Sequence, residues 1–178
     1  MKRGDQSDAP SDAKRVKPKR REAPNAPTTT IYSLSEEETV DLGRNMAQSL
    51  RGGELLILEG DLGMGKTVFA RGIAAGLGIA QEEVRSPSFT LVHEYENGKF
   101  PLFHVDLYRL ESVEEMEGLG LDDLTEAGGV VMIEWGDKLP PWFRRGALTI
   151  RFHDLGEGSR RIELDESNRF PPERRGDA

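Results

Sequence analysis

The 178-residue sequence contains no cysteine, and this shortage, together with others, excludes several kinds of site and protein. Without cysteine there is no disulfide framework, no thiolate nucleophile and no cysteine-ligated zinc site. No apolar run approaches the roughly 18 residues that a membrane-spanning helix needs. The N-terminal segment lacks the apolar stretch of a secretory signal, and its acidic residues fit an organelle transit peptide poorly. We therefore expect a cytoplasmic protein with no membrane segment.

Large apolar side chains are also scarce, and the shortage is greatest at the two ends of the chain. Hydrophobic residues make up only 36% of the sequence, and residues 1–29 and 166–178 contain few of them. Such segments bury too little surface to offset the entropy lost on folding. We therefore expect a disordered tail at residues 1–29, one domain at residues 30–165 and a polar tail at residues 166–178.

Basic charge is scarce outside the N-terminal segment. Residues 1–29 hold eight Lys or Arg against four Asp or Glu, although the whole chain has a net charge of −8, so residues 30–178 are strongly acidic. Such a body lacks the basic face of a protein that grips nucleic acid. The basic run at residues 14–21 is a weak motif, and a solvated tail explains it better than a nuclear signal or an RNA-binding arm.

Apolar patterning predicts alternating strands and helices. Uninterrupted apolar runs indicate strands buried on both faces, Ser-x-x-Glu indicates helix starts, and Asn-Gly between two strands indicates a hairpin. The predicted helices span residues 35–50, 68–77 and 112–118, and the predicted strands span residues 55–58, 89–95, 100–108, 130–133, 147–152 and 160–164. The last two should form an antiparallel pair at the sheet edge. The expected class is α/β, a single three-layer domain whose mixed, mainly parallel sheet has an antiparallel edge hairpin.

The strongest motif is G-x-x-x-x-G-K-S/T, which lies between a predicted buried strand and a predicted helix. Its residues are Gly60, Asp61, Leu62, Gly63, Met64, Gly65, Lys66 and Thr67. Glycines allow backbone N–H groups to point into one concavity, and the following helix N-terminus attracts an anion. An exposed Lys66 can then reach the β- and γ-phosphates, and the Thr67 hydroxyl can ligate Mg²⁺. The alternative, a glycine-rich turn before a helix, explains the context less well, so we expect a P-loop NTPase fold.

The bound nucleotide is expected to be ATP. The Asn-Lys-x-Asp signature that reads guanine is absent from the sequence, and so is an Asp-x-x-Gly switch motif.

Two carboxylates follow predicted strands, where α/β sheets open onto their ligands. Asp106 and Glu134 are candidates for the acid near the metal and for the group that orients the attacking water. The alternative for each is a carboxylate that caps a neighbouring helix. Trp135, directly after Glu134, is compatible with a packing role and with a lid over the site.

Histidine offers a weaker signal. His93 and His104 could meet across the predicted hairpin, and His104-x-Asp106 has the form of a pair of metal ligands. Without cysteine or a third histidine nearby, a core or surface role is favoured.

Taken together, these residues resemble the TsaE (YjeE) family, small bacterial ATPases of tRNA N6-threonylcarbamoyladenosine biosynthesis. The match spans about residues 34–139. The residues that carry it are Gly60–Thr67, Arg71-Gly72, Gly76–Gly78, Ser86–Val92, Glu94-Tyr95, His104–Leu110 and Glu134-Trp135. Met64 stands where Ala is common in the family and Ser88 where Thr is common, and neither change removes a ligand-bearing group.

The resemblance implies roles for individual residues. Thr67 and Glu134 would ligate Mg²⁺, and Asp106 would position or activate water, with Lys66 and Trp135 beside the phosphates and the nucleotide. The Ser86–Thr90 segment would act as a switch-like loop. A residue near Glu36 and a loop near Gly158 or Ser159 would lie against the nucleotide. The resemblance also implies a weak, partner-stimulated ATPase that binds the TsaD–TsaB pair and meets tRNA only through these partners.

Two rival functions remain open. A P-loop small-molecule kinase usually closes an arginine-bearing lid over its second substrate. Between Asp106 and Glu134 the only arginine is Arg109, which argues against such a lid. The other rival is an ATP-dependent switch whose slow hydrolysis is incidental.

Overall fold

The computed structural model describes residues 28–169. The parts of the predicted tails at residues 1–27 and 170–178 lie outside the described residues. Strand β1 (Thr28–Ser33) starts two residues before the predicted domain boundary, because its β-branched residues pair with a strand near the other end of the domain. No helix between residues 28 and 169 has the length and apolarity needed to cross a bilayer.

Seven strands form one sheet in the order β1-β7-β6-β2-β5-β4-β3. Besides β1, they are β2 (Leu55–Glu59), β3 (Val92–Tyr95), β4 (Leu102–Asp106), β5 (Val130–Glu134), β6 (Leu148–Gly156) and β7 (Ser159–Asp165). Strands β6, β2, β5 and β4 run parallel, and the outer strands pair antiparallel. The carboxyl ends of β2, β5 and β4 therefore lie side by side at the same end of these parallel strands.

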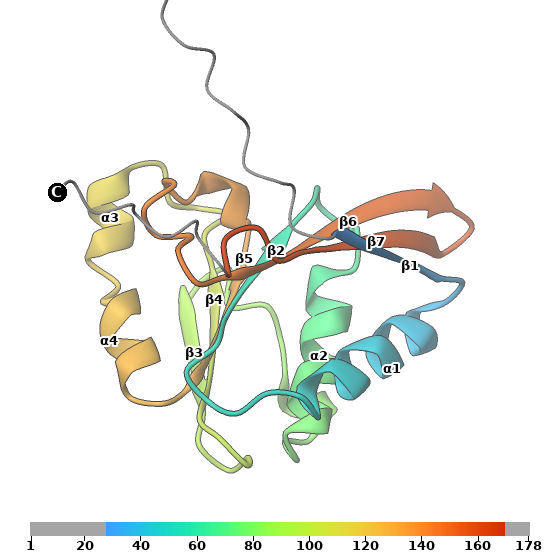
Figure 1. Ribbon diagram of the computed structural model, residues 1–178, viewed down its shortest axis with the longest axis horizontal. Helices are drawn as coiled ribbons and strands as arrows, with labels where there is room; N and C mark the ends of the chain where they lie inside the picture. Colours follow the sequence, from blue (N-terminus) through green and yellow to red (C-terminus); the bar gives the residue numbers. More distant parts are fainter. Residues whose placement is uncertain (1–27, 170–178) are drawn as a thin grey trace, which may run out of the picture.

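Helices cover both faces of this sheet (Figure 1). They are α1 (Glu36–Ala47), α2 (Lys66–Gly76), α3 (Val113–Glu117) and α4 (Leu121–Glu126), with short 3₁₀ helices η1 (Gln81–Glu83) and η2 (Gly136–Lys138). Alternate residues of β2 show the layering, since Leu56 and Leu58 pack in the α1/α2 core and Ile57 packs in the α3/α4 core. The expected mixed α/β, three-layer fold is confirmed.

Helices α1 and α2 approach closely because glycines line their contact. A Cβ atom on Gly72 would lie 2.1 Å from the Val40 carbonyl oxygen, and one on Gly43 would lie 2.4 Å from the Phe69 carbonyl oxygen. This packing fixes the N-terminus of α1, with Glu36, near the start of α2.

Some local predictions were wrong. Strands β6 and β7 are antiparallel as expected but do not form the sheet edge, because β1 adds outside β7. The strand predicted from residue 89 starts only at Val92, since Leu91 has a left-handed backbone (φ 67°). The helix start predicted at Ser35 is confirmed, since the Ser35 side chain caps α1 by accepting from the Glu38 N–H.

Candidate functional site

The loop from Gly60 to Gly65 joins β2 to α2 and has a backbone that only glycine tolerates at key points. Gly60 (φ 137°) and Gly65 (φ 100°) have positive φ. A Cβ atom would meet the Phe152 carbonyl oxygen at Gly60 and the Arg160 side chain at Gly65. Gly65 is the N-cap of α2 and offers no side-chain acceptor to the first-turn N–H groups. Those groups are therefore suited to bind an anion.

Lys66 is buried, with 4% of its surface exposed, whereas the sequence analysis expected it to be exposed. Its ammonium donates to the carbonyl oxygens of Gly60 (2.6 Å) and Asp61 (2.8 Å), so the side chain folds back across its own loop. Burial lowers the pKa of Lys66, and the nearby carboxylates of Glu134 and Asp106 oppose this effect only in part. The loop thus holds a poorly solvated cation.

Glu134, the last residue of β5, lies at the carboxyl ends of the central strands and contacts two other polar side chains there. Its Oε1 accepts a hydrogen bond from the Thr67 hydroxyl (2.7 Å) and lies 2.9 Å from His104 Nε2. The parallel register of β2, β5 and β4 brings these groups together, because Glu134 lies opposite Leu58 and Asp106. A hydroxyl beside a carboxylate is the type of oxygen donor set that Mg²⁺ prefers, so these residues fit the metal.

His104 is fully buried, as favoured for a core histidine, and lies opposite His93 in the β3–β4 register. Within residues 28–169, no group of three or more His, Asp or Glu side chains is arranged so that it could hold a metal ion by itself.

Asp106, the last residue of β4, is held by three donors. Its Oδ2 accepts from the hydroxyls of Ser86 (2.5 Å) and Ser88 (2.6 Å), and its Oδ1 accepts from the Tyr108 N–H (2.8 Å). These bonds place the 86–88 segment directly against the carboxylate. Neither Asp106 nor Glu134 caps a helix backbone in the described structure, in contrast to the alternative that the sequence left open.

Trp135 has a left-handed backbone (φ 60°), which is strained for a residue with a large side chain. Such a conformation costs about 1–3 kcal/mol and recurs at functional sites. The indole ring lies 4.1 Å from Lys66 Nζ, and its centroid lies 4.9 Å from that of the Tyr108 ring. Trp135 therefore packs on the loop lysine and also forms one wall of the site.

An open cleft of about 910 Å³ lies above these groups. This volume lies within the range of about 300–1,000 Å³ that small-molecule sites occupy. Of the predicted site residues, those that line it are Glu36, Leu62, Gly63, Gly65, Lys66, Thr67, Asp106, Glu134 and Trp135. Gly60, Asp61 and Met64 instead line a smaller hollow, and Ser159 lines neither.

Arg160 lines the cleft and was missed by the sequence analysis, which pointed to Ser159. Its Nε donates to the Met64 carbonyl oxygen (3.1 Å), and its Nη1 donates to that of Gly158 (2.8 Å). Neighbouring residues of a strand face opposite sides of the sheet, so Ser159 cannot share this position. The sequence did hold a signal for Arg160. It lies two residues before the buried Ile162 of β7, and residues two apart in a strand share one face of the sheet.

Other lining residues were also not singled out as site residues. They are Val68, Arg71, Arg85, Tyr108 and Arg109, whereas Ser86, Ser88 and Phe89 belong to the predicted switch-like segment and also line the cleft.

Comparison with known proteins gives a consistent result. A sequence model of the family described as "Threonylcarbamoyl adenosine biosynthesis protein TsaE" matches residues 33–162. Proteins named tRNA threonylcarbamoyladenosine biosynthesis protein TsaE from Bacillus subtilis and Treponema pallidum are 40% and 38% identical to this chain over 130 and 132 residues. These matches cover 73% and 74% of this chain and 80% and 96% of the relatives.

A similar protein of known structure is YdiB from Bacillus subtilis. It matches with a TM-score of 0.62 and 34% sequence identity, over 78% of this chain and 84% of that chain.

Proposed function

Since the chain belongs to the TsaE family, we propose that it binds and hydrolyses ATP as a component of the machinery that forms N6-threonylcarbamoyladenosine in tRNA. The observation that carries the ATPase proposal is the bond between Thr67 and Glu134 (2.7 Å) at the start of α2. It joins the last residue of the phosphate-loop motif to the carboxylate of a neighbouring strand end, as a P-loop metal site requires.

Different residues of the cleft would bind the metal ion and the phosphates. Thr67 and Glu134 would hold Mg²⁺, whose positive charge would help to neutralise the charge that develops on the phosphates during hydrolysis. The first-turn N–H groups of α2 would bind phosphate oxygens. Lys66 would exchange the carbonyl oxygens of Gly60 and Asp61 for phosphate oxygens, which compensate its buried charge better than neutral acceptors do.

We assign the attacking water to Asp106. Water attacks the γ-phosphorus, the bond to the β–γ bridging oxygen breaks, and ADP leaves while Asp106 accepts the proton from the water. Asp106 stands opposite Glu134 in the β4–β5 register and is oriented by Ser86 and Ser88. A carboxylate that is held by hydroxyls and lies beside the two proposed metal ligands, Thr67 and Glu134, is suited to orient a water without itself ligating the metal.

The partners are proposed at the level of the family. A TsaD–TsaB-like pair would bind this chain and stimulate its turnover, and tRNA would be met only through that pair. The net charge of −8 supports indirect contact with tRNA, since tRNA and the chain carry charge of the same sign. A cytoplasmic location stays a prediction.

The test compares ATP binding and phosphate release for the parent, Lys66→Ala and Lys99→Ala. Lys66→Ala should lose measurable ATP binding in calorimetry while remaining folded. Lys99→Ala is the matched control, because Lys99 is exposed and stacks on Phe100 away from the cleft. Unchanged ATP affinity in a folded Lys66→Ala variant would contradict the proposed site.

Phosphate release should rise when a TsaD–TsaB pair is added and should need no organic acceptor. A requirement for an organic phosphate acceptor would favour a small-molecule kinase instead.

A further inference from the structure

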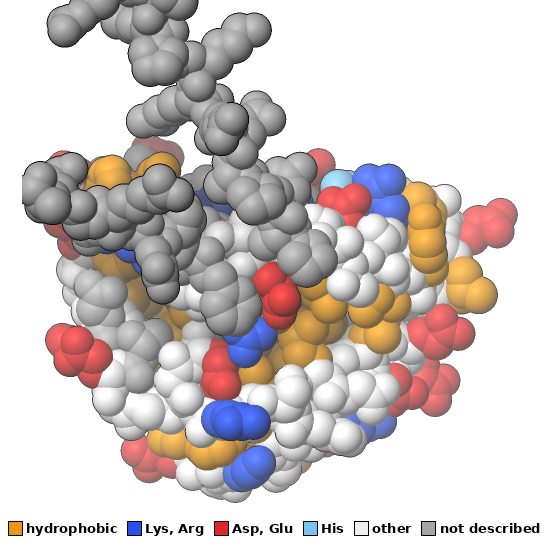
Figure 2. All heavy atoms as spheres, in the orientation of Figure 1, with side chains coloured by type: hydrophobic (Ala, Val, Ile, Leu, Met, Phe, Trp, Pro, Cys, Tyr) orange, Lys and Arg blue, Asp and Glu red, His pale blue; other side chains and the backbone are white. Residues whose placement is uncertain are grey.

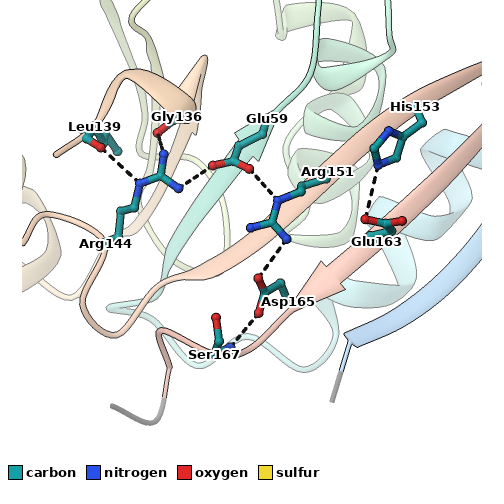
Figure 3. A network of polar contacts seen from close by, with 9 residues as sticks. All are labelled: Glu59, Gly136, Leu139, Arg144, Arg151, His153, Glu163, Asp165 and Ser167. Atoms are coloured by element: carbon teal, nitrogen blue, oxygen red, sulfur yellow. Dashed lines mark hydrogen bonds and ion pairs between the residues drawn. The ribbon is translucent and has the colours of Figure 1, made fainter. Parts of the chain in front are cut away.

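Arg144 links the strand that precedes the phosphate loop to the turn that follows Glu134. Its Nη1 donates to Glu59 Oε1 (2.5 Å), its Nη2 to the Gly136 carbonyl oxygen (2.7 Å) and its Nε to that of Leu139 (3.1 Å) (Figure 3). Glu59 ends β2 immediately before Gly60, whereas Gly136 follows Trp135. The rigid fork of a guanidinium holds such a set of acceptors in fixed relative positions.

The turn that Arg144 grips is the one with the strained Trp135 backbone. Gly136 lies so close to β2 that a Cβ atom would be 2.1 Å from Ile57 Cγ2. The Gly136 carbonyl oxygen also accepts from the Leu139 N–H (3.1 Å). A strained residue keeps its conformation only where its surroundings over-determine it. The Arg144 side chain constrains this turn from outside, because it is anchored on Glu59 of β2 and binds the Gly136 carbonyl oxygen.

The position of this turn also affects Lys66, because Trp135 contacts Lys66. The indole ring lies 4.1 Å from Lys66 Nζ, in the part of the cleft where the proposed phosphates bind. We propose that Arg144 is a positioning residue that, by joining Glu59 to the Gly136 carbonyl, holds Trp135 over Lys66 in the geometry needed to bind nucleotide. The nucleotide part of this proposal rests on the proposed function.

The same network provides a matched control. Arg151 Nε donates to the other oxygen of Glu59 (2.8 Å), and Arg151 Nη1 donates to Asp165 (2.8 Å). Arg151 therefore shares the Glu59 carboxylate with Arg144 but bridges to β7 instead of to the Trp135 turn (Figure 3). Both arginines are partly buried and pair with Glu59, so loss of either should lower the melting temperature, and only loss of Arg144 should move Trp135.

The experiment uses Trp135 as its own reporter. Trp142 is the only other tryptophan, and Trp142→Phe makes Trp135 the sole tryptophan, whose emission can be excited selectively over that of tyrosine. In this background, without nucleotide, Arg144→Gln should shift the Trp135 emission and raise its quenching by acrylamide. Arg144→Lys should do the same, because an ammonium can still pair with Glu59 but cannot reproduce the fork. Arg151→Gln should leave emission and quenching unchanged while it lowers the melting temperature.

Arg144→Lys retains the cation and so keeps the test decisive if Arg144→Gln does not fold. Unchanged emission and quenching in folded Arg144→Lys would overturn the proposal, and so would an equal change in Arg151→Gln.

Nucleotide affinity is measured on the same variants. ATP binding should weaken by about tenfold in Arg144→Lys, the loss expected for one desolvated cation–π contact, and by less than about twofold in Arg151→Gln. A fluorescence change without this loss would overturn the link from Arg144 to nucleotide binding. If the parent chain itself binds no ATP, the proposed function fails, whereas the fluorescence still decides whether Arg144 holds Trp135.

Discussion

The two carboxylates at neighbouring strand ends have different surroundings, which argues for different tasks. Glu134 shares one oxygen between the Thr67 hydroxyl and His104, and Thr67 is the motif residue expected to ligate the metal. Asp106 accepts instead from Ser86 and Ser88, which lie on a separate loop. Glu134 is therefore tied to the start of α2, where the metal is proposed to bind, and Asp106 is tied to the loop beside the proposed γ-phosphate.

Substitution of each carboxylate by its amide should separate the two roles. Glu134→Gln should weaken ATP affinity and raise the Mg²⁺ concentration needed for half-maximal turnover, because a metal ligand acts in the bound ground state. Asp106→Asn should keep ATP affinity and lose about 10²–10⁴-fold in turnover, because a group that accepts the proton from water acts in the transition state. The measurement is ATP affinity and phosphate release with the TsaD–TsaB pair present. Normal turnover in Asp106→Asn would move the water-orienting role elsewhere, and swapped phenotypes would reverse the two assignments.

Among the secondary-structure elements, the contact between α1 and α2 is what places Glu36 at the cleft. The helices touch through backbone atoms, since Gly43 and Gly72 face the Phe69 and Val40 carbonyl oxygens. Such close packing maximises van der Waals contact but leaves no space for a side chain. The position of the α1 N-terminus therefore depends on Gly43 and Gly72, which themselves do not line the cleft.

Gly72→Ala should destabilise the domain by about 1–3 kcal/mol, because the added methyl would overlap the Val40 carbonyl and push α1 away. Urea unfolding measures this change. Gly118→Ala is the control, since a Cβ atom there meets ordinary contacts of 3.4 Å and 3.5 Å and its φ is −62°. That control should be neutral or slightly stabilising. Equal stability of the two variants would show that α1 can shift at little cost.

In the molecule as a whole, β1, β7 and β6 extend the sheet beyond the α/β centre, and one ion-pair network joins the two parts. Glu59 at the end of β2 binds Arg151 of β6, and Arg151 binds Asp165 of β7 (Figure 3). Burial alone would raise the pKa of Asp165, but hydrogen bonds from Ser167 and Arg151 outweigh it and hold the pKa below its ordinary value. On the face that Figure 2 displays, acidic and basic side chains are interspersed among apolar ones.

Asp165→Asn should make the melting temperature less dependent on pH in the acid range. Because the folded state lowers the pKa of Asp165, the unfolded chain binds the proton more tightly and stability rises with pH in this range. The contribution is complete above about pH 4, the ordinary pKa, and is lost as pH falls through the lower folded value. The difference in melting temperature between the parent and Asp165→Asn should therefore be largest near neutral pH and shrink below about pH 4.

Arg151→Gln removes one of the groups that lower this pKa, so it should reduce the same pH dependence. A parent-minus-variant difference that stays constant down to the most acid pH would contradict the assigned direction of the Asp165 shift.

The sequence by itself determined most of the helices and strands, though not β1 or α4, and pointed to the candidate site residues, because these depend on local patterns. The spacing from Gly60 to Thr67 requires positive φ and a helix start, and both are present. Uninterrupted apolar runs at β2 and β5 fixed two buried parallel strands, which brought Glu134 to the carboxyl end of the sheet. Such signals involve residues close together in the chain, so no knowledge of distant contacts is needed to read them.

Only the tertiary structure decided which distant side chains complete the site. Lys66 is buried because its own loop carbonyls and Trp135 enclose it, which no local pattern reveals. The facing of β7 selects Arg160 over Ser159, and the fold brings Arg144 to Glu59 across 85 residues of sequence. The addition of β1 outside β7 likewise follows from pairing across the whole domain. These features depend on strand register and on packing between remote elements, and a long-range contact leaves no trace in local spacing.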